Sequence, residues 1–359
     1  MDLEKRIQLV KEVGEEVITE EELRKLFTEK KKPVAYDGFE PSGKIHLPQG
    51  ILRAINANKM IKAGCKFKML VADWHAWANN KMGGDLEVIK KVGEYFIEVW
   101  KSTGMDLDNV EFVWASDSVL DDEYWKIVMN VARKGTLQRV LRTTQIMGRG
   151  EKDTLSAAQI LYPCMQTADI FYMNVDIAQL GMDQRKVNVF AREIGPDLGF
   201  WKPISVSHHM LMGLTAPGVT EEMDATERAI ALKMSKSKPD TSIFMTDSAG
   251  EIERKIANAY CPASQARENP VLEYAKFVVF ELFKEIEIER PSKFGGNATF
   301  TDYAELEKAF TEGKLHPMDL KKAVAKYVDK AVEPTRKHFE KNPKARKLFE
   351  FVQLQQVTR

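Results

Sequence analysis

The chain has 359 residues, of which 44% are hydrophobic, so it is long enough for roughly two or three domains and can fill a core. Its 53 basic and 53 acidic residues cancel, and any nucleic-acid-binding surface must therefore be local. Three cysteines, none in a Cys-x-x-Cys pair, argue against a disulfide scaffold or structural zinc and favour a reducing, cytoplasmic location. The charged start lacks a signal-peptide core, and no apolar run approaches the ~20 residues that span a bilayer, so we expect neither secretion nor a membrane protein.

The first 32 residues are predicted to form N-terminal helices. Apolar residues recur at helical spacing from Leu3 to Val17. A second helix is predicted to begin at Thr19, because Glu22 follows three residues later as in a capping box.

From Pro33 onward, strand-like runs alternate with helical patterns. The runs begin near residues 34, 67, 110, 176 and 204. This alternation predicts a parallel α/β sheet with both faces covered, over residues 33–248, and residues from about 118 to 160 read as a helical insertion. Beyond residue 249 the strand signal fades, and helical patterns at 251–259, 272–283, 303–310 and 318–339 predict a separate helical domain over 249–359.

The segment Lys233-Met234-Ser235-Lys236-Ser237 alternates basic with small residues. Such a pattern fits a solvated loop, because runs of charge are commonly exposed. It also fits a mobile phosphate loop, in which lysines supply point charges and serines let the backbone approach an anion. A loop of this kind suits a reaction that expels pyrophosphate, because negative charge builds on the leaving group.

A turn-rich segment from Pro41 to Gly50 follows the first strand of the predicted sheet. Small residues such as Gly43 at a strand-to-helix turn let backbone N–H groups face a phosphate, and His46 can donate to it. A tight turn with a packed histidine is the alternative. The segment matches neither the dinucleotide fingerprint nor the P-loop, which excludes both of those interpretations.

Tyr162, Gln166 and Asp169 are four and three residues apart, so they share one face of a helix. On an otherwise apolar helix they form either an internal hydrogen-bond network or a polar ligand site. The cluster Gly181-Met182-Asp183-Gln184-Arg185-Lys186 follows a later strand, at the place where open α/β sheets bind ligands.

Taken in this order and spacing, these segments resemble class I aminoacyl-tRNA synthetases, with Lys233 to Ser237 as the complete KMSKS loop. The form Tyr36-Asp37-Gly38-Phe39-Glu40-Pro41-Ser42-Gly43 resembles tyrosyl-tRNA synthetases of the archaeal and eukaryotic type. Two C-terminal segments, Lys293-Phe294-Gly295-Gly296 and Leu315-His316-Pro317-Met318-Asp319-Leu320, resemble the same family. The resemblance runs over nearly the whole chain from about Pro33.

The resemblance implies a Rossmann-like catalytic domain and an α-helical anticodon-binding domain. It implies ATP-dependent activation of L-tyrosine, with Mg²⁺ accompanying ATP as substrate, and transfer of tyrosine to its tRNA. We expect no resident metal site and no tightly bound cofactor. The family's dimerisation through the insertion implies a homodimer.

Residue roles follow from matching positions. Tyr36 and Asp169 would bind the phenol, whereas Tyr162, Gln166 and Gln184 would surround the ammonium group. His75 would line the ring pocket, with a packed histidine as the alternative. The remaining implied roles are catalysis by His46, Lys233 and Lys236, ATP binding by Gly43, His46 and Lys236, and tRNA contact by Arg185, Lys186, Phe294, His316 and Asp319. For His316 and Asp319 the alternative is a helix cap.

One departure concerns the family's His-x-Gly-His element, where this chain has Pro48 and Gln49 after His46 and Leu47. The proline ring can still stack on a base, and the glutamine can hydrogen-bond in place of histidine, so the ATP contacts must differ in detail. A tryptophanyl-tRNA synthetase is the nearest alternative, since that family shares the same loops. A small nucleotidyltransferase and an RNA-binding protein without catalysis are more distant ones.

Overall fold

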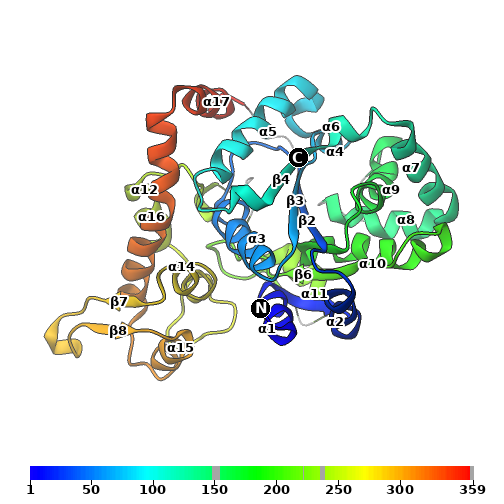
Figure 1. The fold of residues 1–359 in the computed structure, drawn as a ribbon. Coiled ribbons are helices and arrows are strands. Elements are labelled where there is room, and N and C mark those ends of the chain that lie inside the picture. The colour runs from blue at the N-terminus through cyan, green and yellow to red at the C-terminus, as the bar shows by residue number, and fades with distance from the viewer. Residues whose placement is uncertain (148–153, 221, 235–238, 356–359) are drawn as a thin grey trace.

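The computed structural model describes residues 1–147, 154–220, 222–234 and 239–355 (Figure 1). A six-stranded sheet lies at its centre. The strands are β1 (Gly14–Ile18), β2 (Val34–Phe39), β3 (Lys66–Val71), β4 (Val110–Trp114), β5 (Ile177–Gly181) and β6 (Ile204–His208). Their order across the sheet is β1-β6-β5-β2-β3-β4, and all neighbours are parallel except β1 with β6.

The five parallel strands have the order of a doubly wound nucleotide-binding sheet, whose direction of progression reverses between β2 and β5. At this point β2 and β5 pair only through Ala35↔Ile177 and Tyr36↔Ala178. In contrast, β2 stays paired with β3 as far as Phe39↔Val71. The sheet therefore opens beside the carboxyl end of β2, where folds of this kind bind ligands. This confirms the predicted Rossmann-like sheet.

Helices cover both faces of the sheet, as the sequence predicts. Those of the first 248 residues are α1 (Leu3–Val13), α2 (Glu20–Glu29), α3 (Arg53–Lys62), α4 (Asp73–Ala78), α5 (Leu86–Trp100), α6 (Ala115–Ser118), α7 (Asp122–Lys134), α8 (Leu137–Thr143), α9 (Ala157–Tyr172), α10 (Arg185–Ile194) and α11 (Ala225–Leu232). Helix α2 has Thr19 as its cap, and the Thr19 side chain accepts a hydrogen bond from Glu22 N, as predicted.

The prediction that the first helix extends to Val17 is wrong. Helix α1 ends at Val13, and Val17 lies in β1 at the edge of the sheet. Successive β-branched residues, Val17-Ile18-Thr19, favour the extended conformation here. A Cβ atom at Gly14 would lie 2.8 Å from Val206 Cγ1, so this close strand approach requires glycine.

The C-terminal region is mainly helical and lies beside the sheet, on the side opposite to α7 and α8 (Figure 1). Its helices are α12 (Ala249–Ala257), α13 (Pro270–Tyr274), α14 (Phe280–Phe283), α15 (Tyr303–Thr311), α16 (Pro317–Lys341) and α17 (Pro343–Gln353), with a π-helical turn at Ala275–Val279. The expectation that strands are absent here is wrong, because β7 (Ile286–Ile288) and β8 (Ala298–Phe300) pair antiparallel. Strands of three residues are too short to show a periodic pattern.

His209 joins the sheet to the C-terminal region. Directly after β6, its Nδ1 lies 2.5 Å from Glu15 Oε1 of β1 and its Nε2 lies 3.0 Å from Glu273 Oε2 of α13. Its ring also stacks on Phe277, with 4.3 Å between the ring centroids. Although burial opposes protonation, the two carboxylates raise the pKa of His209 to about 9. A charged His209 therefore links β1, the end of β6 and α13 near neutral pH.

Replacing His209 by Gln should cost stability in a pH-dependent way. Because the folded-state pKa is raised, the stabilisation by the imidazolium is fully present below the unfolded pKa of about 6.5 and disappears as pH rises through about 9. Urea unfolding of the parent and H209Q at pH 6 and pH 9.5 measures this. We expect a difference in unfolding free energy on the order of 1–3 kcal/mol at pH 6 and a much smaller one at pH 9.5. An equal difference at both pH values would contradict the ionic role.

Candidate active site

The predicted tyrosine-contacting residues gather where the sheet opens beside β2. Asp169, on α9, is almost completely buried, and its Oδ2 lies 2.9 Å from His75 Nε2 of α4. Its Oδ1 accepts a hydrogen bond of 3.0 Å from Tyr124 Oη of α7. Burial disfavours the charged imidazole, yet the adjacent Asp169 carboxylate outweighs this and raises the pKa of His75. Three elements thus converge on one buried carboxylate.

The Tyr36 hydroxyl, from β2, is buried at the same place. Burial and then the charge of Asp169 raise the pKa of Tyr36 well above its ordinary value, so the phenol keeps its proton. Within the described residues, neither Tyr36 Oη nor Gln166 Oε1 forms a hydrogen bond of good geometry. Leaving such a buried group unpaired costs about 1–3 kcal/mol, so these atoms fit a polar ligand that supplies the partner.

Gln166 and Gln184 extend the polar wall away from Asp169. Gln166 Nε2 donates to Gln184 Oε1 at 3.2 Å, and Gln184 Nε2 donates to Ile146 O at 3.0 Å. The Tyr162 ring meets His75 edge to face, with 5.1 Å between centroids. Burial and the nearby Glu40 raise the pKa of Tyr162, which keeps it neutral. The structure thus brings together all six residues predicted to contact tyrosine.

The turn after β2 contains a position whose backbone conformation favours glycine. Gly43 adopts a φ of 103°, which favours glycine over residues with a side chain. His46 lies opposite Phe244 in an isolated antiparallel bridge. Pro48 and Gln49, the two residues that differ from the family's His-x-Gly-His element, begin a π-helical turn over Pro48–Leu52. The Gln49 carbonyl accepts a hydrogen bond of 2.8 Å from Trp100 Nε1.

The lysine loop is described only at its start. Lys233 directly follows α11, and its Nζ lies 2.8 Å from Asp183 Oδ2, in the turn after β5. This ion pair brings the loop to the polar end of the sheet. Lys236, Ser235 and Ser237 lie outside the described residues.

The residues predicted to contact tRNA lie in two separate places. Arg185 makes a bidentate ion pair with Glu16 of β1, at 2.6 and 3.0 Å, and Lys186 Nζ contacts Gln145 Oε1. Both cations are therefore already paired within the chain. The other three lie in the C-terminal region, far from α9 (Figure 1).

His316 caps α16, because its Nδ1 accepts a hydrogen bond of 3.2 Å from Met318 N, and Asp319 lies in the first turn of that helix. The alternative interpretation as a helix cap is therefore confirmed for His316. Phe294 ends the turn Ser292–Phe294, and its side chain is not among those described.

Sequence reasoning missed Tyr124 and a second buried polar group. The Arg53 guanidinium, from α3, lies 2.6 Å from Asp37 Oδ2 and 2.7 Å from His208 Nε2. Gln179 Nε2 in turn lies 2.7 Å from His208 Nδ1. The adjacency of Asp37 to Tyr36 was the available signal for this network, whereas Tyr124 gave none beyond its place on an amphipathic helix.

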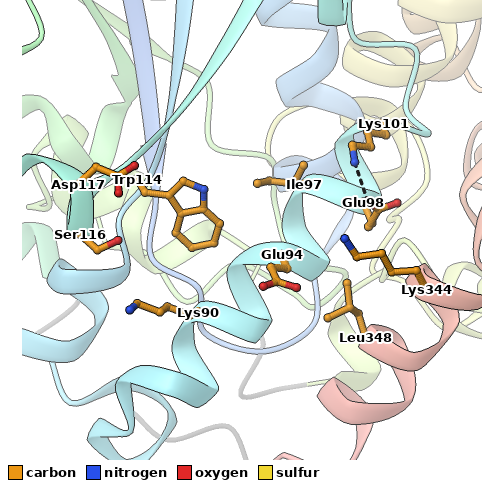
Figure 2. A pocket seen from close by; sticks show the side chains of 10 residues that line it. All are labelled: Lys90, Glu94, Ile97, Glu98, Lys101, Trp114, Ser116, Asp117, Lys344 and Leu348. Carbon is orange, nitrogen blue, oxygen red and sulfur yellow. Dashed lines mark hydrogen bonds and ion pairs between the residues drawn. The ribbon is translucent and has the colours of Figure 1, made fainter.

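A separate cleft of about 500 Å³ lies between α5, the end of β4 and α17 (Figure 2). Its wall mixes charges of both signs, and Lys101 Nζ lies 2.7 Å from Glu98 Oε1. Within the described ranges there is no cluster of three or more His, Cys, Asp or Glu residues suited to a metal ion. No helix in the described part of the chain is long and apolar enough to cross a membrane.

Comparison with known proteins agrees with this geometry. Residues 28–333 match the family described as tRNA synthetases class I (W and Y), and the chain belongs to this family. It is 49% identical over its whole length to tyrosine–tRNA ligase 1, cytoplasmic, of Arabidopsis thaliana, of which it covers 90%. It is 43% identical to the tyrosine–tRNA ligase of Thermococcus kodakarensis, with 99% of this chain and all of that one covered.

Solved structures distinguish the two branches of the family. Tyrosyl-tRNA synthetase from Pyrococcus horikoshii, complexed with L-tyrosine, superposes with a TM-score of 0.90 at 42% identity over 98% of this chain and 100% of that one. The tryptophanyl-tRNA synthetase of Encephalitozoon cuniculi, bound to tryptophan, reaches 0.70 at 15% identity over 97% of this chain and 92% of that one. The second likeness shows a shared fold alone.

Replacing Tyr124 by Phe removes a single hydroxyl from the Asp169 cluster. We expect the KM for tyrosine to rise about ten-fold or more, because a buried carboxylate loses a donor worth about 1–3 kcal/mol. Tyr172→Phe is the matched control: Tyr172 Oη donates to Asp121 Oδ2 at 2.9 Å, and its ring packs against Tyr124 without reaching Asp169. Amino-acid-dependent pyrophosphate exchange measures both variants. Equal KM values for Y124F and the parent would remove Tyr124 from the site.

Proposed function

We propose that this chain activates L-tyrosine with ATP, forming tyrosyl-adenylate and pyrophosphate, and then transfers tyrosine to the 3′ end of its tRNA. The observation that carries the proposal is the buried pair of Tyr36 and Asp169, held by His75 and Tyr124 at the opening of the sheet. A phenol is a donor and an acceptor, so it can satisfy the Asp169 carboxylate and the Tyr36 hydroxyl together.

Tyrosine is favoured over tryptophan by the same atoms. An indole N–H can donate to a carboxylate, but it has no acceptor for the Tyr36 hydroxyl. It would therefore leave one buried group unpaired. The relatives named as tyrosine–tRNA ligases, at 43–49% identity, support the same choice.

The chemistry of adenylate formation needs positioning and charge rather than a protein nucleophile. The tyrosine carboxylate attacks the α-phosphorus of ATP, and pyrophosphate leaves with its charge. Tyr162, Gln166 and Gln184 would hold the ammonium end in line with that attack. Gly43, His46, Lys233 and Lys236 would meet the phosphates, and Mg²⁺ would enter with ATP as part of the substrate.

Different parts of the chain would carry out activation and tRNA binding. Residues 33–248 would form the catalytic domain, with the N-terminal segment 1–32 packed on it, and residues 249–359 would bind the anticodon. Phe294, His316 and Asp319 would read the first anticodon base, and Arg185 and Lys186 would contact tRNA nearer the site. We also propose a cytoplasmic location, in line with the name of the Arabidopsis relative.

A homodimer through the insertion at about 118–160 is supported by the surface of α7 and α8. Met129 and Leu137 are 59% and 63% exposed, and Leu120 and Leu141 in the same segment are exposed as well. Apolar side chains grouped on one exposed face mark an association surface. Light scattering of the purified chain distinguishes two copies from one.

Pyrophosphate exchange with tyrosine, tryptophan and phenylalanine tests the activity itself. We expect exchange with tyrosine, and we expect a double variant of Tyr36 and Asp169 with small apolar residues to lose the preference for tyrosine over phenylalanine. The physical reason is that the substrate hydroxyl would then be buried without partners, at a cost of roughly 1–3 kcal/mol for each unpaired group. Exchange driven equally by tryptophan would contradict the assignment, and an unchanged preference in the folded double variant would remove the two residues from phenol recognition.

Asp319→Ala should weaken aminoacylation of tRNA while leaving pyrophosphate exchange unchanged. Asp319 lies at the start of α16, away from the site on α9, and a carboxylate can accept hydrogen bonds from a base edge. Loss of one base contact typically costs about 1–3 kcal/mol. Steady-state aminoacylation and exchange, measured on the same preparation, separate the two effects. Equal loss of both activities would show that Asp319 stabilises the helix rather than reads tRNA.

A further inference from the structure

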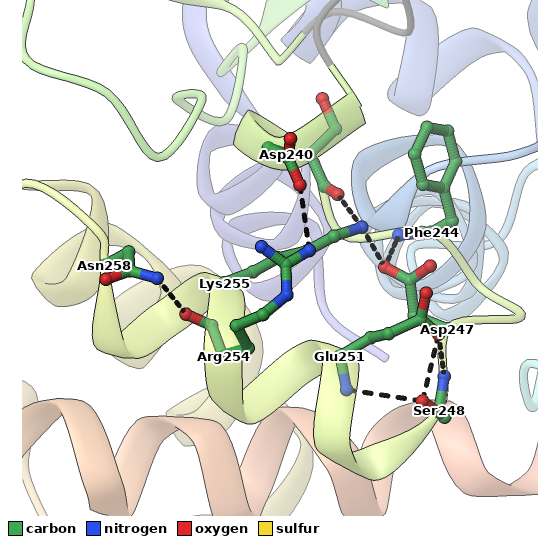
Figure 3. Close-up of polar contacts among 9 residues, drawn as sticks. Asp240, Phe244, Asp247, Ser248, Glu251, Arg254, Lys255 and Asn258 are labelled. Atoms are coloured by element: carbon green, nitrogen blue, oxygen red, sulfur yellow. Dashed lines mark hydrogen bonds and ion pairs between the residues drawn. The ribbon is translucent and has the colours of Figure 1, made fainter.

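Lys255, on α12 in the C-terminal region, carries a buried charge that the proposed mechanism does not use. Its Nζ lies 2.6 Å from Asp247 Oδ2, and the two side chains are only 5% and 7% exposed. The same Nζ donates to Ser242 O at 2.8 Å (Figure 3). One ammonium group thus joins both ends of the segment 242–247, which leads from the lysine loop to α12.

The middle of this segment is paired with the turn that contains His46. Leu47 N donates to Ile243 O at 2.7 Å, and Met245 N donates to Ile45 O at 3.0 Å. The Met245 side chain also packs closely against Gly50, because a Cβ there would lie 2.5 Å from Met245 Sδ. The backbone position of His46 therefore follows that of residues 243–245.

Phe244 connects the ion pair to this bridge. Its N–H donates to Asp247 Oδ2 at 2.9 Å, so one carboxylate oxygen holds both Phe244 and Lys255 (Figure 3). Lys255 Nζ also lies 5.0 Å from the centre of the Phe244 ring. The residue opposite His46 is thus fixed through its backbone and through its ring by a group on α12.

We propose that Lys255 is a positioning residue for the ATP half of the reaction. It holds the segment 242–247 against the turn at residues 45–47 and thereby sets where His46 stands relative to the triphosphate. The proposal rests on the proposed function, because it takes His46 as a phosphate-contacting residue. Small displacements of such a group cost rate steeply, since phosphoryl transfer depends on alignment.

The helices that hold Lys255 and Asp247 in place lie outside the catalytic sheet. Helix α12 belongs to the C-terminal region, and Lys321 Nζ of α16 donates to Ala257 O at its end, at 2.9 Å. Arg336 Nη1, also on α16, donates to Asp247 O at 3.0 Å. Helix α16, which His316 caps, therefore contacts Asp247 directly and contacts α12 at Ala257, two residues after Lys255. Lys255 links this helical region, through Asp247 and Phe244, to the turn that contains His46.

The test compares three variants of the full chain by pyrophosphate exchange, at a temperature where circular dichroism shows all of them folded. Lys255→Met removes the charge and keeps the chain length, and Asp247→Asn weakens the pair while keeping an acceptor for Phe244 N. Lys59→Met is the matched control, because Lys59 Nζ also joins the sheet domain to the C-terminal region, 2.7 Å from Glu281 Oε1, but does not contact residues 45–47.

We expect kcat/KM for ATP to fall about ten-fold or more in K255M and less in D247N, with the KM for tyrosine within about two-fold of the parent. K59M should keep both parameters while losing thermal stability. A folded K255M with unchanged ATP dependence overturns the proposal, as does equal loss for both substrates. If K255M does not fold, an unchanged ATP dependence in D247N overturns it instead. If the parent chain shows no tyrosine-dependent exchange, that result contradicts the proposed function and does not bear on the contact between Lys255 and Asp247.

Discussion

The carboxylate of Asp169 is the group around which the candidate site is built. An ionised group that is 1% exposed persists only when its charge is compensated and its oxygens are hydrogen-bonded. His75 of α4 lies against Oδ2 as a source of compensating charge, Tyr124 of α7 donates a hydrogen bond to Oδ1, and both residues are themselves buried. The need to satisfy one charge therefore ties α9 to two other helices. The same need positions the wall of the pocket before any substrate arrives.

This arrangement determines which groups a ligand must carry in order to bind. The candidate site combines the Tyr36 hydroxyl and the Asp169 carboxylate with the amide groups of Gln166 and Gln184. A ligand that buries an apolar ring beside them must offer a donor and an acceptor to Tyr36 and Asp169 and a polar or charged group to the amides. Specificity then comes largely from what a wrong ligand leaves unpaired, as a difference between two affinities.

The sequence predicted the parallel sheet, its five parallel strands and the shared face of Tyr162, Gln166 and Asp169, because these depend on local periodicity. It did not reveal Tyr124, which lies 45 residues before its partner and meets it only through the packing of α7 on α9. Nor did it show β1, where tertiary pairing with β6 ends a helix that amphipathic spacing alone would continue. The capping role of His316 was among the alternatives that the sequence left open, and only the geometry at Met318 N decided it.

The two halves of the site differ in how firmly their charges are held. On the amino-acid side, the cluster around Asp169 is buried, and breaking its contact with His75 would leave a charge without compensation. On the phosphate side, the ion pair of Lys233 with Asp183 is 28% and 10% exposed, so water can take over for either partner at a smaller cost. A phosphate that arrives near Lys233 would replace the Asp183 carboxylate with another anion and keep the lysine paired. Under the proposed function, the rigid half would select the amino acid and the looser half would follow the charge that develops on the leaving group.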